Sequence, residues 1–213
     1  MSKYKILGQP RAGSLIPEFL LTELGVDYIL SFPKKSDLIN PNHEGFNPLG
    51  KIPVLICPDG EKIFETVAIV THITTQFSRL MPLKHEPEYI IYWQLLALLS
   101  TTVYPAYHRQ HQPDKYVDEG GVASLQIKAQ EEQAVVFDYI EGLLSPYLCG
   151  KKITAVDFYF YTLMRWDFDK TRLREGRPNL VRFLNELRSR GSVNKVLLNQ
   201  KINGMTGGKY AEF

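Results

Sequence analysis

Apolar positions in the first part of the chain follow strand spacing and helix spacing in turn. A short apolar run over residues 3–7 predicts a strand, and apolar residues at helical spacing over 15–24 predict a helix that ends at Gly25. Residues 26–32 predict a second strand. A strand, a helix of that length and another strand indicate a right-handed parallel crossover.

After a polar, irregular stretch, the pattern becomes that of a hairpin followed by a helix. Residues 51–57 are apolar and β-branched, residues 58–60 read Pro-Asp-Gly as in a hairpin turn, and residues 61–65 predict the return strand. Residues 66–78 then predict a helix. With the crossover, this order of elements predicts a thioredoxin-like domain over residues 1–79.

A proline-bracketed linker at residues 80–87 precedes a long region without strand signals. Helices are predicted there over residues 89–107 with a break near Pro105, over 122–144 and over 178–190. The expected fold class is therefore an α/β domain followed by an all-helical domain over residues 88–213. We expect its Gly-rich tail, from residue 203, to be loosely held.

One helix start carries a specific sequence signature. Thr154 is followed three positions later by Asp157, directly before the aromatic run Phe158-Tyr159-Phe160-Tyr161. A hydroxyl residue with an acid at this spacing before an apolar run is a capping box. We assign Thr154 and Asp157 to folding and not to chemistry.

Composition and charge narrow the function classes. With 44% hydrophobic and 23% charged residues the chain can bury a sizeable core, and its formal charge of +2 makes no electrostatic case for nucleic acid or an anionic membrane. No apolar run approaches a bilayer span, and the first residues show no signal-peptide pattern. The two cysteines, Cys57 and Cys149, form no metal-type spacing. A cytoplasmic protein with reduced thiols fits best.

The hairpin contains an unusual proline. Pro53 lies near the start of the predicted strand, where it costs the sheet a ladder donor and so belongs at an edge, a bulge or a bend. We infer that the backbone of Ile52 stays unpaired and faces outward, where it can bind an extended peptide like another strand. Beyond the hairpin, Glu65 and Thr66 place an acid beside a helix N-terminus. That pair can hold the amino and carboxylate groups of an amino acid.

The motif Asn-Pro-x-Gly-x-Ile-Pro-x-Leu, followed by Glu-Thr-x-Ala-Ile, resembles the glutathione-binding half of cytosolic glutathione transferases. In that family the proline is cis, the residue before it pairs with the cysteinyl part of glutathione, and an acidic–hydroxyl pair grips the γ-glutamyl end. The resemblance implies these roles for Ile52, Pro53, Glu65 and Thr66, with Thr66 replacing the usual serine. A Pro-bearing hairpin and a Thr-capped helix also occur separately in other α/β domains.

The second half of the chain carries its own match. Gly150-x-x-x-Thr154-x-x-Asp157 before a buried helix resembles the all-helical half of glutathione transferases, where it serves folding. The resemblance therefore spans nearly the whole chain. It implies a homodimer, with no cofactor other than glutathione as a co-substrate.

The loop at residues 8–14 follows the first strand, where ligands of such sheets gather. A free thiol with pKa ~8.5 is only slightly ionised at neutral pH. Ser14, at the start of the first helix, is the candidate hydroxyl that stabilises the glutathione thiolate together with the helix N-terminus. A plain N-cap is its alternative role. Arg11 is a second catalytic candidate, adding positive field or binding a carboxylate.

The residues around Ser14 resemble one class of the family but depart from it. Ala12-Gly13-Ser14-Leu15-Ile16-Pro17 is similar to the bacterial beta-class pattern Ala-Cys-Ser-Leu-Ala-Pro, with Gly13 at the place of the class cysteine. A mixed disulfide with glutathione at that position is therefore excluded. Conjugation by a serine-type site remains open.

Further candidates surround this predicted site. Lys35 and Lys51 could bind the glycyl carboxylate of glutathione, or be ordinary solvated lysines. A second-substrate pocket would be lined by Tyr104, Tyr107, His108 and Trp166, although aromatic residues on helices are more often core. His72 is expected to be structural or to lie at a dimer surface. We predict no metal site, because His108 and His111 lack suitably spaced carboxylate or cysteine ligands.

These patterns favour a glutathione transferase that activates glutathione as a thiolate and conjugates it to a small hydrophobic electrophile, as in detoxification. Catalysis would rest on pKa depression and proximity. One alternative is a non-enzymatic glutathione- or ligand-binding protein, and another is a glutathione-dependent isomerase or dehalogenase. The fold alone does not separate them.

Overall fold

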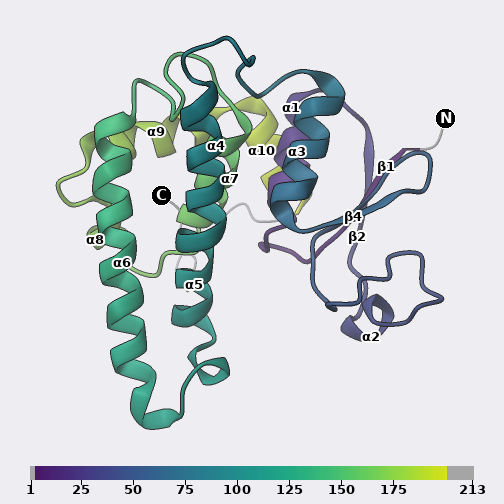
Figure 1. The fold of residues 1–213 in the computed structure, drawn as a ribbon, viewed down its shortest axis with the longest axis horizontal. Helices are drawn as coiled ribbons and strands as arrows, with labels where there is room; N and C mark the ends of the chain where they lie inside the picture. The colour runs from purple at the N-terminus through teal and green to yellow at the C-terminus, as the bar shows by residue number, and fades with distance from the viewer. Residues whose placement is uncertain (1–2, 201–213) are drawn as a thin grey trace. The chain divides into compact units, whose positions relative to one another are not determined.

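The computed structural model describes residues 3–200, so the Gly-rich tail for which we expected loose packing lies outside the described residues. The described chain forms two compact units, one of residues 3–81 with 188–200 and one of residues 82–187 (Figure 1). The predicted domains, 1–79 and 88–213, differ from these units in the last helix, which groups with the N-terminal unit.

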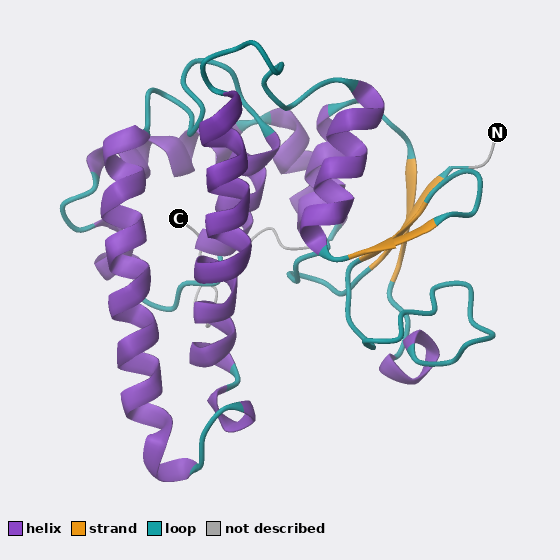
Figure 2. Ribbon diagram, viewed as in Figure 1, coloured by secondary structure: helices purple, strands orange, loops and turns teal. Residues whose placement is uncertain are grey.

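The first unit is built on a mixed sheet of four strands in the order β2-β1-β3-β4 (Figure 2). The strands are β1 (Tyr4–Leu7), β2 (Tyr28–Ser31), β3 (Val54–Ile56) and β4 (Lys62–Phe64). β1 and β2 run parallel, as the crossover prediction requires, and β3 is antiparallel to both of its neighbours. This is the thioredoxin-like arrangement that the sequence predicted.

β3 is shorter than predicted at its beginning. It starts at Val54, directly after Pro53, and not at Lys51. The strand lies inside the sheet between β1 and β4, so its residues need backbone donors on both sides. Because Pro53 has no N–H group, the ladder can begin only after it.

Helices complete this unit and bury apolar side chains. They are α1 (Leu15–Glu23), α2 (Lys35–Leu38), α3 (Thr66–Phe77) and α10 (Gly191–Asn199). In α1, the side chains of Leu15, Ile16, Phe19, Leu20 and Leu21 are at most 1% exposed. α3 and α10 both lie against α1 (Figure 1).

A polar cluster joins α10 to the C-terminal end of α1. The Glu23 carboxylate accepts hydrogen bonds from Arg190 Nε at 2.8 Å and from Ser192 Oγ at 2.5 Å. The sequence pattern had assigned no helix after residue 190, and these contacts join residues more than 160 positions apart in the chain.

The second unit is helical. It contains α4 (Tyr89–Leu98), the π-helical segment η1 (Leu99–Val103), α5 (Tyr104–His111), α6 (Val122–Leu143), α7 (Ala155–Met164), α8 (Lys170–Arg174) and α9 (Pro178–Ser189). The predicted break near Pro105 is wrong, because the chain stays helical from Tyr89 to His111. η1 precedes the proline, and its wider turn, with Tyr104 N–H bonded to Leu99 C=O, accommodates the missing donor of Pro105.

The predicted capping box at the start of α7 is confirmed. One oxygen of the Asp157 carboxylate accepts from Thr154 N–H at 2.7 Å and from Thr154 Oγ at 2.8 Å, and the other accepts from Leu148 N–H at 2.8 Å. Every residue of α7 is buried. The box therefore satisfies backbone donors that water cannot reach.

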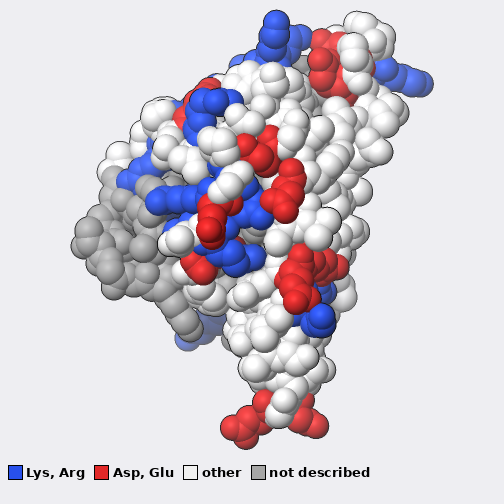
Figure 3. Space-filling model, turned by 90° about the vertical axis from the view of Figure 1, so that its left-hand side faces the viewer, with Lys and Arg blue, Asp and Glu red and all other residues white. Residues whose placement is uncertain are grey.

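The surface charge agrees with the balanced composition. On the face drawn in Figure 3, Lys and Arg side chains are interspersed with Asp and Glu, and no broad area of one sign is visible. Over residues 3–200, none of the helices has the length and apolar character needed to span a bilayer.

Candidate functional site

The turn before β3 presents a free stretch of backbone. The Ile52–Pro53 peptide bond is cis, as the family resemblance implied. Pro53 is buried and Ile52 is half-buried against Leu7, Leu38 and Val54. Neither the N–H nor the C=O of Ile52 makes a backbone hydrogen bond within residues 3–200. The expected unpaired backbone is therefore present at Ile52.

The buried side chain of Asn47 holds this turn in place through hydrogen bonds to its backbone. It is 1% exposed, its Nδ2 donates to Lys51 C=O at 2.8 Å, and its Oδ1 accepts from Leu49 N–H at 3.0 Å. These bonds fix the backbone immediately before Ile52. Sequence reasoning had treated Asn47 only as part of the motif, although an Asn before Pro is itself a turn signal.

Glu65 lies where β4 passes into α3, and its backbone is strained. Its φ of 70° and ψ of 122° are unusual for a residue with a side chain. The Glu65 side chain makes no capping hydrogen bond, while its C=O accepts from Ile69 N–H at 3.0 Å. Strain of this kind persists where the surrounding structure holds it, often at ligand sites.

Thr66 is the first residue of α3, and Glu65 occupies the N-cap position. Thr66 is 9% exposed, and the first backbone bond of the helix runs from Ile69 to Glu65. The N–H groups of the first turn therefore precede the helical ladder and have no partner within the helix. Glu65 and Thr66 therefore lie at the N-terminus of a helix.

The loop between β1 and α1 holds Ser14 in a closed position. The Ser14 hydroxyl donates to Gln9 C=O at 3.0 Å and accepts from Gln9 N–H at 3.3 Å, and the side chain is fully buried. A Cβ on Gly8 would lie 2.2 Å from Ser14 Cβ, so only glycine fits at residue 8. To bind a sulfur atom, the hydroxyl would have to exchange its bond to Gln9 C=O.

Two backbone N–H groups at the same place have no partner among the described residues, although both residues are buried. The N–H groups of Gly13 and Ser14 donate to no acceptor within the described part of the chain. Arg11 adopts a left-handed φ of 63°, and its N–H donates to Gln200 Oε1 at 3.1 Å. The N-terminus of α1 therefore has N–H groups that the described residues leave unpaired.

The two predicted lysines flank the turn that leads to Ile52. Lys35 and Lys51 are both exposed. Lys35 Cε lies 4.0 Å from the position that a Cβ on Gly50 would occupy, so this side chain passes beside the turn. The structure thus brings Lys35, on α2, close to the residue that precedes Lys51.

The four residues predicted for a second-substrate pocket gather within the helical unit. The ring of Tyr104 lies 5.0 Å from both the His108 ring and the Trp166 ring, measured between centroids. Tyr104, His108 and Trp166 are partly exposed. These three rings offer apolar surface with polar edges.

Tyr107 has a different environment. Its side chain is 1% exposed, and its hydroxyl donates to Asp167 Oδ2 at 3.0 Å. Burial, with the neighbouring carboxylate, raises the pKa of Tyr107 well above its ordinary value. Tyr107 therefore packs against Trp166 from inside and presents no face to a ligand, contrary to its predicted place in the pocket lining.

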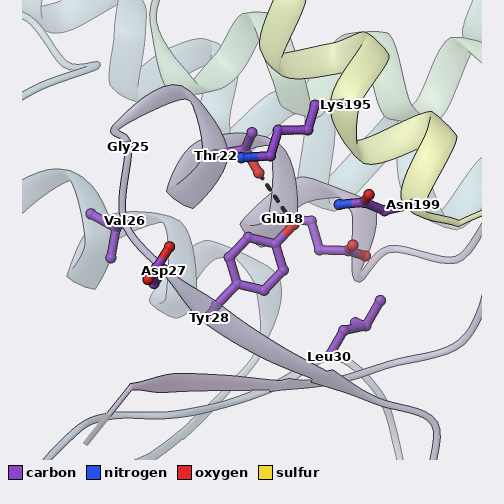
Figure 4. Close-up of a pocket in the computed structure, with 9 residues that line it drawn as sticks. All are labelled: Glu18, Thr22, Gly25, Val26, Asp27, Tyr28, Leu30, Lys195 and Asn199. Carbon is purple, nitrogen blue, oxygen red and sulfur yellow. Dashed lines mark hydrogen bonds between the residues drawn. The ribbon is translucent and has the colours of Figure 1, made fainter. Parts of the chain in front are cut away.

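A cavity of about 430 Å³ lies between α1, the start of β2 and α10, within the first unit (Figure 4). Glu18, fully buried on α1, points toward it. One of its oxygens accepts from Gln200 Nε2, and the other has no partner among the described residues. Because Gln200 also accepts from Arg11 N–H, it connects Glu18 to the loop before α1.

Burial raises the pKa of Glu18 to about 8, against the lowering effect of the Gln200 hydrogen bond. A glutamate in the unfolded chain titrates near pH 4.5. Between these values the folded protein holds a proton that the unfolded chain has lost, so stability falls as the pH rises through this window. Sequence reasoning missed this residue, because an acid in the first turn of a helix is usually exposed.

Glu18→Gln removes this titration. We expect the variant to be more stable than wild type by roughly 4 kcal/mol at about pH 8.5, and to differ little at about pH 4. Urea unfolding at both pH values measures the difference, with the exposed Glu119→Gln as the matched control. Parallel pH profiles of stability for E18Q and wild type would contradict a protonated, buried Glu18.

Comparison with known proteins gives matches over both halves of the chain. The family model for the glutathione S-transferase N-terminal domain matches residues 15–76, and that for the C-terminal domain matches residues 95–190. Glutathione S-transferase GstA of Escherichia coli O157:H7 is 25% identical over 202 residues, covering 91% of this chain and 96% of that protein.

Solved structures share the fold. A glutathione transferase homologue from Sulfitobacter with bound glutathione has a TM-score of 0.80 and 18% identity, covering 93% of this chain and 99% of that one. A beta-class glutathione S-transferase from Sphingomonas chungbukensis has a TM-score of 0.74 and 21% identity, covering 92% and 98%. The two family models together match well over half of the residues, and they show that the chain belongs to the glutathione S-transferase family.

Proposed function

We propose that this protein is a glutathione transferase, which binds glutathione in its N-terminal unit and conjugates it to a small hydrophobic electrophile. One observation carries the proposal: the unpaired backbone of Ile52 and the Glu65–Thr66 start of α3 occur in one unit, flanking the β3–β4 hairpin. The Sulfitobacter and sphingomonad relatives of the same fold were solved with glutathione, which supports this assignment.

Each part of glutathione has a chemical counterpart in the site. The cysteinyl backbone pairs with Ile52 as an added strand. The Glu65 carboxylate takes the α-amino group, and Thr66 with the N–H groups of α3 takes the γ-glutamyl carboxylate. Lys35 and Lys51, both exposed, supply positive charge for the glycyl carboxylate.

The thiolate is stabilised at the N-terminus of α1. Lowering a thiol pKa from ~8.5 by about two units requires roughly 2.7 kcal/mol of preferential interaction with the anion. The N–H groups of Gly13 and Ser14, the helix dipole and one hydrogen bond from the Ser14 hydroxyl together have that capacity. Arg11 adds positive charge to the same loop.

The electrophile binds at the partly exposed aromatic rings of Tyr104, His108 and Trp166 in the helical unit. Catalysis consists of thiolate formation and proximity, without a covalent enzyme intermediate. A cytoplasmic homodimer completes the proposal. Both cysteines are free and buried, as expected in a reducing compartment.

Ser14→Ala tests the catalytic part. We expect the pH–rate profile for conjugation of glutathione to an aromatic halide to shift upward by about one unit, with roughly a tenfold loss of kcat/KM at neutral pH. Ser36→Ala, at an exposed serine on α2, is the matched control. An unshifted pH profile with only a raised KM for glutathione would show that Ser14 holds the loop and does not act on sulfur.

A second candidate function is a glutathione-binding protein without transferase activity. The bonds between the Ser14 hydroxyl and Gln9, and Gly13 at the place of the beta-class cysteine, favour it. Calorimetric binding of glutathione without turnover of aromatic halides or epoxides would support this function and contradict the transferase.

A further inference from the structure

Three potential metal ligands meet at the other end of the β3–β4 hairpin from Pro53. They are the Cys57 thiol, the Glu61 carboxylate and the His72 imidazole, and one ligand atom from each lies within 4.8 Å of the others. Cys57 follows the last residue of β3, whereas Pro53 precedes the first. The cluster is therefore separate from the proposed glutathione site.

The hairpin itself places two of these ligands together. Cys57 N–H donates to Glu61 C=O at 2.8 Å, and Gly60 N–H donates to Cys57 C=O at 2.9 Å. Cys57 and Glu61 are thus the directly opposed residues that close the turn, and such residues project their side chains from the same face of a hairpin. Cys57 is 5% exposed, while Glu61 is exposed and free to adjust.

The third ligand, His72, lies on α3, which packs over the face of the hairpin that carries Cys57. His72 Nε2 lies 3.4 Å from Cys57 Sγ. The ring of Tyr4, on β1, meets the imidazole edge-to-face at 6.3 Å between centroids. Because the β1–β3 register pairs Lys5 with Ile56, Tyr4 lies next to Cys57 and holds His72 against it.

These separations fit zinc. Zn–S bonds of about 2.3 Å and Zn–N bonds of about 2.0–2.1 Å at a tetrahedral angle put the sulfur and nitrogen atoms about 3.5 Å apart. The observed separation of 3.4 Å is close to this value without movement of either side chain. Thiolate, imidazole and carboxylate in a tetrahedral arrangement are a donor set that suits Zn²⁺.

We propose that Cys57, His72 and Glu61 bind one Zn²⁺ ion, with water in the fourth position. The Cys57 thiol loses its proton to solvent when the Zn–S bond forms. Asp59 Oδ1 accepts from Glu61 N–H at 3.0 Å, so a second carboxylate adds negative charge beside the site. The ion ties the hairpin to α3 and stabilises the first unit.

The sequence does not show this site. Three residues separate Cys57 from Glu61, and ten more separate Glu61 from His72, which matches no common zinc spacing. The prediction of no metal site considered spacing alone. Only the hairpin closure and the packing of α3 on the sheet bring the ligands together.

Titration of the tag-free, metal-stripped protein tests the proposal. We expect one Zn²⁺ per chain, and Co²⁺ in its place should give a thiolate-to-metal charge-transfer band in the near ultraviolet. Cys57→Ser should abolish the band, and His72→Ala should weaken Zn²⁺ binding at least ~10-fold. Cys149→Ser is the matched control, because Cys149 is also a free, buried cysteine but belongs to the helical unit, so its variant should keep the band.

A second variant, Glu61→Gln, is used in case Cys57→Ser does not fold. Because Glu61 is exposed, its substitution should leave the fold intact. It should keep the Co²⁺ band and lower Zn²⁺ affinity about tenfold. Absence of the band in wild type, its persistence in C57S or its loss in C149S would overturn the proposal. Glutathione binding is measured separately, so failure of the zinc site leaves the proposed function testable.

Discussion

Glu65→Ala and Glu65→Gly should lose glutathione binding equally but differ in stability. Both remove the carboxylate that we assign to the α-amino group of glutathione, a charged hydrogen bond of about 2–3 kcal/mol, or roughly 30–150-fold in Kd. Only the glycine variant relieves the strained φ of 70° at this position. We expect Glu65→Gly to be more stable than Glu65→Ala by about 1–2 kcal/mol.

Calorimetry with glutathione and urea unfolding measure the two effects separately. Glu65→Gln is the matched control, because it keeps the side-chain shape and the backbone strain but removes the charge. It should retain wild-type stability and still bind glutathione weakly. Equal glutathione affinity for wild type and all three variants would remove Glu65 from the proposed site.

Asp157→Ala should destabilise the helical unit by about 3–5 kcal/mol. The Asp157 carboxylate is fully buried and accepts three hydrogen bonds, from Leu148 N–H, Thr154 N–H and Thr154 Oγ. Alanine leaves these buried donors without partners at the start of a helix whose residues are all buried. The loss should appear as a large fall in the urea midpoint.

Two further variants calibrate this result. Thr154→Ala removes only the hydroxyl of the capping box and should cost about 1 kcal/mol. Asp114→Ala, at an exposed position of the same unit, should change stability by less than about 0.5 kcal/mol. If Asp157→Ala unfolds at the wild-type urea concentration, the capping box does not support this unit.

Local patterns predicted most of the fold. The apolar spacing of α1, the turn residues before β4 and the Thr154–Asp157 box each act over a few neighbouring residues, so their physical cause is visible in the sequence. The same holds for the free backbone at Ile52, which follows from the chemistry of Pro53. The strand ends were less accurate, because they depend on which neighbouring strand supplies the hydrogen bonds.

Features that depend on tertiary packing could not be predicted. α10 joins the first unit through Glu23 and its partners at the far end of the chain. The Ser14 hydroxyl has a choice of acceptors, and only the structure shows that it bonds to Gln9. From the sequence alone Glu18 is expected to be an exposed acid in the first turn of a helix, but packing beside α10 buries it. These cases involve a side-chain rotamer or a distant contact, for which short-range spacing carries no signal.

A crystal structure of the protein with glutathione tests the central claim most directly. We predict that the cysteinyl backbone of glutathione pairs with the N–H and C=O of Ile52, with the α-amino group within hydrogen-bond distance of the Glu65 carboxylate. Glutathione bound away from both residues, or no binding in crystals soaked at saturating glutathione, would contradict it.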